Sequence, residues 1–403
     1  MTRCSELADI EWLTGDEAGV VLAELAGNTG PLHSAVARLR RTFTAAQTHL
    51  LLEQVDLRRR AAAKFTKPAQ MFFTRVGLEQ ATDEWTARYK AQRFLSTPPR
   101  SNSTVPTIVD LCCGIGGDLL ALAASTPTLG VDLDRISAHF AAINTGATVL
   151  QTDVTAFDFD GILAWHIDPD RRATGQRTTN LDYYQPDVAA IEQLLARCPH
   201  GAVKLAPATK VPPHWLEGCE LEWISRDREC KQLVAWHGNL ARNAGSVRAT
   251  VISSGSRSAP RSITGAPNHP LAITSQIDRY VFDVDPAVTA ARLTGALAAE
   301  HNLAALGAGP TYLTGPAAID DAALTCFEVD EILTLEIRKL AQHLRNLGIG
   351  QLEIKKRGID IVPEKLRRDL KLRGSNAAVL LITQTAGKPI VVLAHRITTA
   401  PTQ

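Results

Sequence analysis

The stretch Ile108-Val-Asp-Leu-Cys-Cys-Gly-Ile-Gly-Gly-Asp118 carries the strongest fold signal in this chain. Its first four residues predict a buried strand, its glycines predict a tight turn, and the apolar run that follows predicts a helix. Glycine lets the backbone pass close to a ligand, and the free N–H groups at the start of a helix point toward it. We therefore expect a strand, a turn and a helix, with Gly114, Gly116 and Gly117 holding a cofactor.

Acidic residues lie in or directly after the strand-like runs of this region. Asp110 lies in the first run, Asp132 ends the second run 22 positions later, and Asp153 ends the third. An acidic side chain at the end of the second strand is where such sites hold the hydroxyls of a ribose. We expect Asp132 to bind a ribose and Asp153 to accept a hydrogen bond from an adenine amine.

Two kinds of cofactor carry an adenine and a ribose that this pattern could bind. A nicotinamide dinucleotide needs Gly-x-Gly-x-x-Gly, and the third glycine is missing because Asp118 and two leucines follow Gly117. Asp110 and Asp118 would also repel a pyrophosphate, whereas Asp110 suits a cationic amine. The methionine part of S-adenosyl-L-methionine carries such an amine. The pattern therefore favours S-adenosylmethionine as the cofactor.

The surrounding chain predicts an α/β fold. Residues 96–106 are rich in proline and serine, and after them the apolar spacing changes from helical to strand-like. Strands that alternate with helix-sized stretches are typical of a parallel sheet. We expect these strands at 108–111, 129–131, 149–150, 164–167 and 202–205. An antiparallel pair at 221–225 and 232–237 is expected to end the sheet, and a long loop is expected at 253–276.

The length of 403 residues exceeds one ordinary compact core, so several domains are expected. The pattern predicts an N-terminal helical domain at 1–100 and a cofactor-binding domain at 101–255. Mixed helical and strand-like segments predict a C-terminal α+β domain at 277–403.

The formal net charge is only +1, but the charges are segregated along the chain. Residues 31–100 carry 13 Lys and Arg against five acids, and residues 338–373 carry 11 against four. Either stretch alone is most simply a solvated helix face, whereas two such stretches favour contact with the phosphates of a nucleic acid. The cations expected at this contact are Arg58, Arg59, Arg60, Lys64, Lys355, Lys356, Arg357, Arg367, Arg368 and Arg373.

The composition excludes several classes of protein. A content of 45% hydrophobic and 21% charged residues is that of a globular chain and not of a disordered or fibrous one. The seven cysteines include no Cys-x-x-Cys pair, and the histidines show no metal spacing, so we expect no disulfide scaffold and no metal. His166 lies within an apolar run and is expected to be a core residue. No secretory signal or membrane-spanning run is visible, which predicts a cytoplasmic protein of undetermined oligomeric state.

The order of these motifs resembles that of the bacterial Rossmann-type S-adenosylmethionine-dependent methyltransferases with a C-terminal THUMP-like domain. The resemblance is carried by the glycine turn and by four further motifs, Val131-Asp132, Ile167-Asp-Pro-Asp-Arg-Arg172, Met71-Phe-Phe-Thr-Arg75 and Glu353-Ile-Lys-Lys-Arg-Gly358. It implies a Rossmann-like methyltransferase sheet and S-adenosylmethionine as the cofactor. Because THUMP domains are RNA-binding modules, it also implies that RNA is the substrate and that the cations above contact it.

The resemblance further implies that the fourth strand ends beside the transferred methyl group. Base-amino methyltransferases carry (Asp/Asn)-Pro-Pro-aromatic there, so that an oxygen holds the target amine and the aromatic ring stacks on the flipped base. This chain departs from that motif after Pro169, and its nearest downstream aromatic residues are Tyr183 and Tyr184. The departure leaves a ring nitrogen or a ribose oxygen open as the target. The expected catalytic residues are Asp168, Pro169, Asp170 and Arg171.

The sequence therefore predicts a methyltransferase that acts on rRNA or tRNA, with a base as the expected target. Two alternatives stay open at this point. The unusual Asp-Pro-Asp-Arg order would also suit a non-catalytic RNA-binding or assembly factor on the same scaffold. The enzyme could instead methylate a substrate other than RNA.

Overall fold

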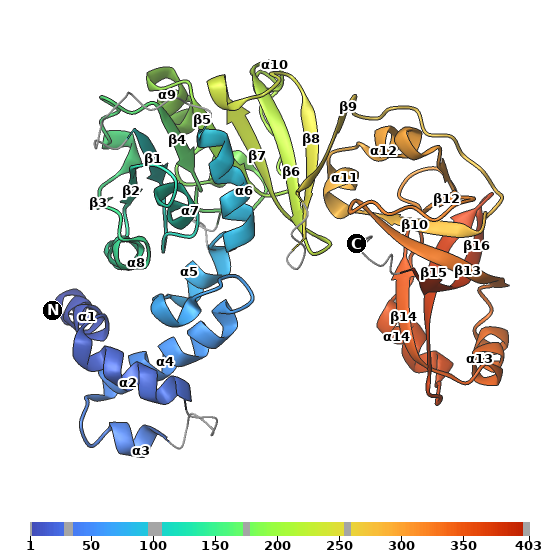
Figure 1. Ribbon diagram of the computed structural model, residues 1–403, viewed down its shortest axis with the longest axis horizontal. Helices are drawn as coiled ribbons and strands as arrows, with labels where there is room; N and C mark the ends of the chain where they lie inside the picture. The colour runs from blue at the N-terminus through green and yellow to red at the C-terminus, as the bar shows by residue number, and fades with distance from the viewer. Residues whose placement is uncertain (1, 28–34, 96–106, 172–177, 254–258, 398–403) are drawn as a thin grey trace. The chain divides into compact units, whose positions relative to one another are not determined.

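The computed structural model describes residues 2–27, 35–95, 107–171, 178–253 and 259–397 (Figure 1). The chain divides into two compact units, which are described separately. The first comprises Met1–Cys219 and Val234–Ala244, and the second comprises Glu220–Leu233 and Gly245–Gln403. These cuts differ from the boundaries expected at residues 100 and 255, because the N-terminal helices share a core with the cofactor-binding segment. The three expected domains stay a prediction.

The first unit begins with helices. They are α1 (Thr2–Leu13), α2 (Asp16–Gly27), α3 (Val36–Leu39), α4 (Ala45–Ala61), the 3-10 turn η2 (Pro68–Gln70), α5 (Arg75–Gln80) and α6 (Glu84–Phe94). A capping box starts α4, in which Thr44 Oγ1 accepts the Gln47 N–H at 3.2 Å and Gln47 Oε1 accepts the Thr44 N–H at 3.1 Å. The apolar faces of α1 to α5 share one core with Ile115 and Phe140, which lie after the first strand.

The chain then forms a nine-stranded sheet in the order β3-β2-β1-β4-β5-β7-β6-β8-β9, of which residues 220–233 and 245–265 belong to the second unit. Its strands are β1 (Ile108–Leu111), β2 (Thr128–Asp132), β3 (Val149–Gln151), β4 (Ala164–Ile167), β5 (Gly201–Leu205), β6 (Cys219–Arg226), β7 (Glu229–His237), β8 (Val247–Ile252) and β9 (Arg261–Gly265). The connecting helices are α7 (Leu119–Ala123), α8 (Arg135–Thr145), α9 (Val188–Arg197) and α10 (Trp215–Gly218), with 3-10 turns η3 (Val154–Ala156), η4 (Leu181–Tyr183) and η5 (Gly238–Leu240). The first five strands pair in parallel, which confirms the predicted α/β class.

The far edge of this sheet differs from the prediction. The strands expected at 221–225 and 232–237 are present as β6 and β7, but β8 and β9 continue the sheet beyond them. The prediction of a loop at 253–276 was wrong for residues 261–265, which form β9 and pair antiparallel with β8. Only one residue of β9, Ile263, has a buried side chain, so the segment has the composition of a loop. Its backbone nevertheless pairs with β8 at the edge of the sheet.

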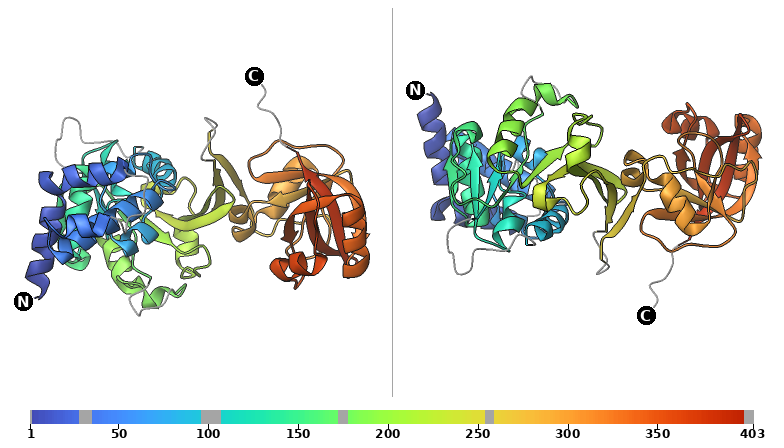
Figure 2. Two further views of the ribbon diagram at one scale, coloured as in Figure 1. Left: turned by 90° about the horizontal axis from the view of Figure 1, so that it is seen from below. Right: turned by 90° about the horizontal axis from the view of Figure 1, so that it is seen from above.

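The second unit contains a seven-stranded sheet in the order β11-β12-β10-β13-β16-β15-β14. Its strands are β10 (Tyr280–Val284), β11 (Ala304–Ala305), β12 (Leu313–Gly315), β13 (Leu324–Thr334), β14 (Ile349–Lys356), β15 (Asn376–Thr385) and β16 (Lys388–Arg396). Its helices are α11 (Pro286–Ala290), α12 (Thr294–His301), α13 (Ile337–Asn346) and α14 (Pro363–Leu370). The helices α13 and α14 lie beside each other next to the outer strand β14 (Figures 1 and 2). This arrangement confirms the predicted C-terminal α+β segment.

Candidate active site

The three glycines of the turn between β1 and α7 differ in why a side chain would not fit or is absent. Gly114 and Gly116 have φ angles of 56° and 88°, which residues with side chains rarely adopt. A Cβ on Gly116 would lie 2.8 Å from Thr145 Cγ2, and one on Gly117 would lie 3.0 Å from the Thr82 carbonyl oxygen. A Cβ on Gly114 would meet no described atom within 4 Å. The packing of the protein thus requires Gly116 and Gly117, whereas Gly114 borders open space that a ligand can enter.

Asp132, at the end of β2, is bound to this turn. Its Oδ2 accepts the backbone N–H of Gly114 at 2.7 Å, and its Oδ1 accepts that of Asp134 at 2.9 Å. Burial raises the pKa of Asp132 to about 6, although both hydrogen bonds act in the opposite direction. The structure therefore brings two of the predicted cofactor residues, Asp132 and Gly114, into direct contact.

Asp153 lies at the same edge of the sheet but in a different environment. The residue before it, Thr152, donates its backbone N–H to the Asp132 carbonyl oxygen at 3.1 Å. The Asp153 side chain is exposed, and its Oδ1 accepts the N–H of Thr155 at 2.8 Å and its hydroxyl at 2.7 Å. These hydrogen bonds lower the pKa of Asp153, so its carboxylate stays ionised at the rim of the turn.

Asp110, on β1, is buried and paired with His166 on β4. Its Oδ1 lies 2.7 Å from His166 Nδ1, and its Oδ2 has no hydrogen-bond partner among the described residues. Lys90 Nζ lies 3.2 Å from His166 Nε2, and because lysine can only donate, Nδ1 carries the ring proton that His166 donates to Asp110. Burial raises the pKa of Asp110, and the imidazole opposes this effect. The carboxylate is thus held at one oxygen and left with an unpaired second oxygen.

Asp118 and Lys90 form the other half of this buried network. Lys90 Nζ lies 2.7 Å from Asp118 Oδ1, and the Thr82 hydroxyl donates to Asp118 Oδ2 at 2.6 Å. The exposed fractions of the two charged side chains are 2% and 8%. Burial alone would raise the pKa of Asp118, but Lys90 and His166 outweigh it and lower that pKa. The sequence suggested that the Asp118 carboxylate would repel a pyrophosphate. In the folded protein, Lys90 balances the charge of this carboxylate.

Asp168 follows β4 and forms an ion pair with Lys204 on the neighbouring β5. The Lys204 Nζ lies 2.5 Å from Asp168 Oδ2 and 3.4 Å from the Gln80 carbonyl oxygen. The Asp168 side chain is 28% exposed and that of Lys204 is 12% exposed. Burial lowers the pKa of Lys204, but Asp168 and Asp118 outweigh this effect and raise it. The end of β4 therefore presents a carboxylate beside a charged ammonium group.

The residues after Asp168 are held in place by backbone pairing. Pro169 is buried, and Asp170 exchanges two backbone hydrogen bonds with Gln185, at 2.8 and 3.0 Å. Gln80 Nε2 also donates to Asp170 Oδ1 at 3.0 Å. Arg171 is half-buried at the end of the described segment. The structure thus keeps Asp168 to Arg171 together at the carboxyl end of the sheet.

Of the two downstream tyrosines, one is buried and one is exposed. The Tyr184 hydroxyl lies 2.9 Å from Thr209 Oγ1, and the ring is buried. Tyr183 is 56% exposed. Since Gln185 pairs with Asp170, the exposed ring of Tyr183 belongs to the chain segment that is anchored at the end of β4.

The predicted N-terminal cations are largely engaged by the protein itself. Arg58 donates to the Met71 carbonyl oxygen at 2.9 Å and lies over the Phe72 ring, and burial lowers its pKa. Lys64 donates to three carbonyl oxygens at the end of α5, at 2.8 to 2.9 Å. Arg60 lies 3.7 Å from Asp56, and Arg59 is exposed on the same helix. Arg58 and Lys64 therefore stabilise the helical segment.

The predicted C-terminal cations divide into two groups. Lys355 and Arg357 point from β14 and the residue after it to the buried carboxylate of Asp283, at 3.1 and 2.8 Å. Arg228 reaches the same carboxylate at 3.2 Å, and these cations lower the pKa of Asp283 although burial raises it. Lys356 lies between the two paired cations and is exposed. The alternation follows from the strand, because successive side chains point to opposite faces.

The cations of α14 and the segment after it are the more exposed set. Arg367 is exposed and donates to the Leu352 carbonyl oxygen at 3.2 Å. Arg368 and Arg373 are exposed and have no ion-pair partner among the described residues. Lys365 and Lys371, which belong to the same basic stretch of the sequence, share these properties.

Three features of the site were not predicted from the sequence: Lys90, Lys204 and the paired role of His166. His166 is buried as expected, but it contacts Asp110 and is not an apolar core residue. A signal for the lysines was present, since Lys204 interrupts an otherwise apolar strand and Lys90 lies on the buried face of α6. A lysine that is buried in a folded protein nearly always has an ion-pair or hydrogen-bond partner.

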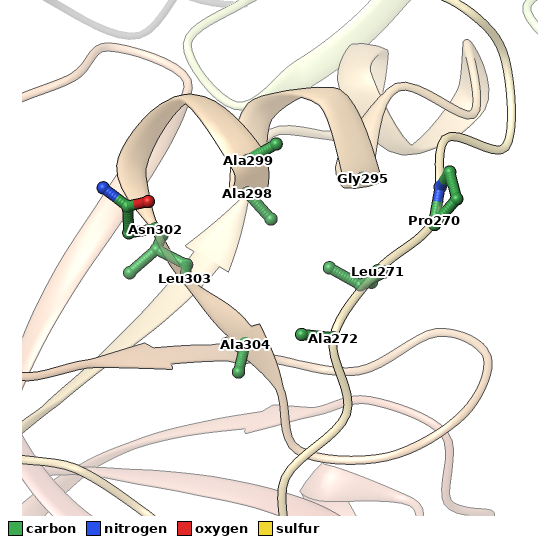
Figure 3. Close-up of a pocket in the computed structure, with 9 residues that line it drawn as sticks. All are labelled: Pro270, Leu271, Ala272, Gly295, Ala298, Ala299, Asn302, Leu303 and Ala304. Carbon is green, nitrogen blue, oxygen red and sulfur yellow. The ribbon is translucent and has the colours of Figure 1, made fainter.

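Two further features belong to the second unit. A cavity of about 350 Å³ is bordered by small and apolar side chains on α12 and on the segments before and after it, such as Leu271, Ala298 and Leu303 (Figure 3). Glu300, His301 and Asp321 lie within reach of one metal ion, but Arg261 already contacts Glu300 at 2.6 Å and Asp321 at 3.0 Å. No helix in the described ranges is both long and apolar enough to cross a bilayer.

Comparison with known proteins places the chain in a family. A family model described as THUMP domain-like matches residues 324–396, which run from β13 to β16. The crystal structure of a Porphyromonas gingivalis W83 protein, assigned as a methyltransferase, has a TM-score of 0.70 at 20% identity and covers 98% of both chains. It shows that the fold is shared along the whole length.

Two Mycobacterium tuberculosis proteins, from strains CDC 1551 and H37Rv, are named uncharacterized S-adenosylmethionine-dependent methyltransferases. Each is 31% identical over 350 residues, which cover 83% of this chain and 92% of the relative. These matches confirm the resemblance inferred from the motifs. The chain therefore belongs to the S-adenosylmethionine-dependent methyltransferases and uses S-adenosylmethionine as its methyl donor.

Proposed function

We propose that this methyltransferase acts on RNA, with rRNA or tRNA as the substrate. The observation that carries the proposal is a cationic surface in the THUMP-like segment. It consists of exposed side chains for which the described part of the chain offers no ion-pair partner, namely Lys356, Lys365, Arg368, Lys371 and Arg373. We call these residues the α14 surface. Cations that the protein does not neutralise remain available to phosphates.

The cofactor residues are proposed from how well the turn fits S-adenosylmethionine. The unpaired Oδ2 of Asp110 suits the ammonium group of the methionine part, because a buried carboxylate oxygen needs a donor. Asp132 suits the ribose hydroxyls, and the open space beside Gly114 allows a close approach. Asp153 is proposed to accept from the adenine amine. The cofactor supplies a methyl group on a positively charged sulfur.

The catalytic residues are proposed at the end of β4. Asp168 is partly exposed and contacts Lys204 through one oxygen, so its side chain can orient a group that donates a hydrogen bond. Pro169 and Asp170 hold this carboxylate in place through burial and backbone pairing. Arg171, next in the chain, is proposed to contact the substrate's phosphate.

Methyl transfer to RNA can be tested with a labelled donor and total cellular RNA. We expect label in rRNA or tRNA, and we expect Asp168→Ala to abolish transfer while calorimetry still detects cofactor binding. Label found only in protein or in small molecules would contradict the RNA proposal. If no molecule in the mixture is labelled and calorimetry detects no binding of S-adenosylmethionine, a non-catalytic scaffold is favoured.

The RNA surface can be tested with charge reversals. Arg368→Glu combined with Lys371→Glu should weaken RNA binding and reduce the slope of log affinity against log salt by about 0.7–0.9 for each phosphate that the protein no longer binds. Lys388→Glu is the control for each of these reversals made singly, because it makes the same change at an exposed position of β16. Equal effects of all three substitutions would show that net charge and not the α14 surface determines binding.

A further inference from the structure

The ion pair between Asp168 and Lys204 bears on which atom of the substrate receives the methyl group. Lys204 has three N–H donors, and the described residues accept two of them, at Asp168 Oδ2 and at the Gln80 carbonyl oxygen. The third N–H is left to donate. Because 12% of the Lys204 side chain and 28% of the Asp168 side chain are exposed, a substrate can reach both groups.

The charges around this pair disfavour an amine as the acceptor. An amine nitrogen gains positive charge as it takes a methyl cation, and a neighbouring ammonium group opposes that gain. Lys204 is charged, since Asp168 and Asp118 raise its pKa against the effect of burial. Arg171 and the buried Lys90 add further positive charge near Lys204. An amine beside Lys204 would develop its positive charge next to an ammonium group, and the Asp168 carboxylate that could offset it is already paired with that ammonium.

A hydroxyl group matches the same environment. Its oxygen can accept the free N–H of Lys204 through a lone pair, while its proton points to the Asp168 carboxylate. As the C–O bond forms, the oxygen must lose its proton, and partial negative charge on it is stabilised by a fixed donor. Lysine donates and aspartate accepts, so the two side chains together complement one O–H group.

From this geometry we infer that the acceptor is a hydroxyl oxygen and that Lys204 is a catalytic residue beside Asp168. The inference rests on the proposed function, and for an RNA substrate it identifies the ribose 2′-hydroxyl. It selects the ribose oxygen, which the sequence had left open, over the base target that the sequence favoured, because Lys204 was not part of that expectation.

The step balances without any further reactant. A C–O bond forms while the C–S bond of the donor breaks, and the electron pair of that bond neutralises the sulfonium. The hydroxyl proton passes to the Asp168 carboxylate and from there to water. Lys204 keeps its proton throughout and stabilises the oxygen as its O–H bond weakens.

The product identifies the acceptor without any variant. RNA methylated by the wild-type protein is digested to nucleosides and analysed by mass spectrometry, which separates methyl groups on ribose from those on bases. A labelled 2′-O-methyl nucleoside is expected. Label on a base would overturn the inference but leave the RNA proposal standing, whereas label absent from RNA would overturn the proposed function itself.

The role of Lys204 is tested by Lys204→Met, with Lys204→Arg as the charge-keeping variant and Lys210→Met as the control. Lys210 is exposed and lies six residues further along. Loss of one oxyanion donor typically lowers kcat by about 10²–10³-fold. We expect that loss for Lys204→Met, a partial rescue for Lys204→Arg and no change for Lys210→Met.

Cofactor affinity supplies a readout that does not depend on turnover. Calorimetry should give the same Kd for S-adenosylmethionine in Lys204→Met as in the wild type, because Lys204 contacts Asp168 and not the predicted cofactor residues. If Lys204→Met binds cofactor and still forms 2′-O-methyl product at the wild-type rate, Lys204 is not catalytic. If it fails to bind cofactor, the lysine acts on the fold of the site and the inference of a catalytic role is wrong.

Discussion

Replacing Lys90 by methionine is expected to destabilise the first unit strongly. The Lys90 ammonium is buried, lies 2.7 Å from Asp118 Oδ1 and also contacts His166. Methionine preserves most of the side-chain volume, so the main change is the loss of a charge. The substitution strands the buried carboxylate of Asp118, to which the Thr82 hydroxyl still donates. Breaking such a buried pair costs about 3–5 kcal/mol of unfolding free energy.

The size of this loss should depend on pH. The pKa of Asp118 is lowered in the folded wild type, so the pair stabilises the fold above the unfolded-state pKa of about 4 and loses this effect as the pH falls below it. Without Lys90, burial would raise the pKa of Asp118 and penalise its ionised form. The difference between Lys90→Met and wild type should therefore be largest at neutral pH and shrink toward pH 4.

Urea denaturation followed by tryptophan fluorescence measures the effect, since Trp165 and Trp236 are fully buried. Arg88→Met on the same helix is the control, because the Arg88 side chain is 63% exposed and its buried partner Glu84 keeps the hydrogen bonds from the Thr66 N–H and hydroxyl. Since solvent screens the Arg88 side of this pair, we expect a loss of about 1 kcal/mol. Adding Asp118→Asn to Lys90→Met removes the stranded charge and should recover about 1–3 kcal/mol. A loss below about 1 kcal/mol for Lys90→Met, or no recovery in the double variant, would refute the account of a charge-paired network.

The contacts described above support three further predictions. Affinity for S-adenosylmethionine, measured by calorimetry, should fall as the pH drops through about 6. The reason is that the pKa of Asp132 is raised to about 6, and the protonated carboxyl group loses an acceptor for the ribose. The variant Asp132→Asn should bind the cofactor weakly at every pH. Gly117→Ala should lower the unfolding free energy by about 1–3 kcal/mol, because its Cβ would lie 3.0 Å from a backbone oxygen, and an unchanged urea midpoint would contradict this. Asp283→Asn should destabilise the second unit by about 2 kcal/mol, less than a fully buried pair because its three cations are 28–29% exposed, and thermal unfolding would show it.

Local patterns in the sequence predicted the elements that carry the site. The strand, the glycine turn and the helix at 108–124 were correct because apolar spacing and backbone freedom are properties of neighbouring residues. The capping box at Thr44 is local in the same way, since its two hydrogen bonds span only three residues. The strand β9 was missed because its single buried side chain leaves no apolar pattern to recognise.

The roles of the charged residues depend on contacts between distant parts of the chain. Lys355 and Arg357 belong to a basic motif in the sequence, yet they pair with Asp283, which lies more than 70 residues away. Lys90 and Lys204 lie outside the predicted motifs and still reach Asp118 and Asp168. Charge counts along a chain cannot show this, because an ion pair depends on which side chains the fold brings within a few ångströms. Local sequence patterns were therefore sufficient to identify the methyltransferase scaffold, whereas the folded chain determines which cations stabilise it and which remain available to a substrate.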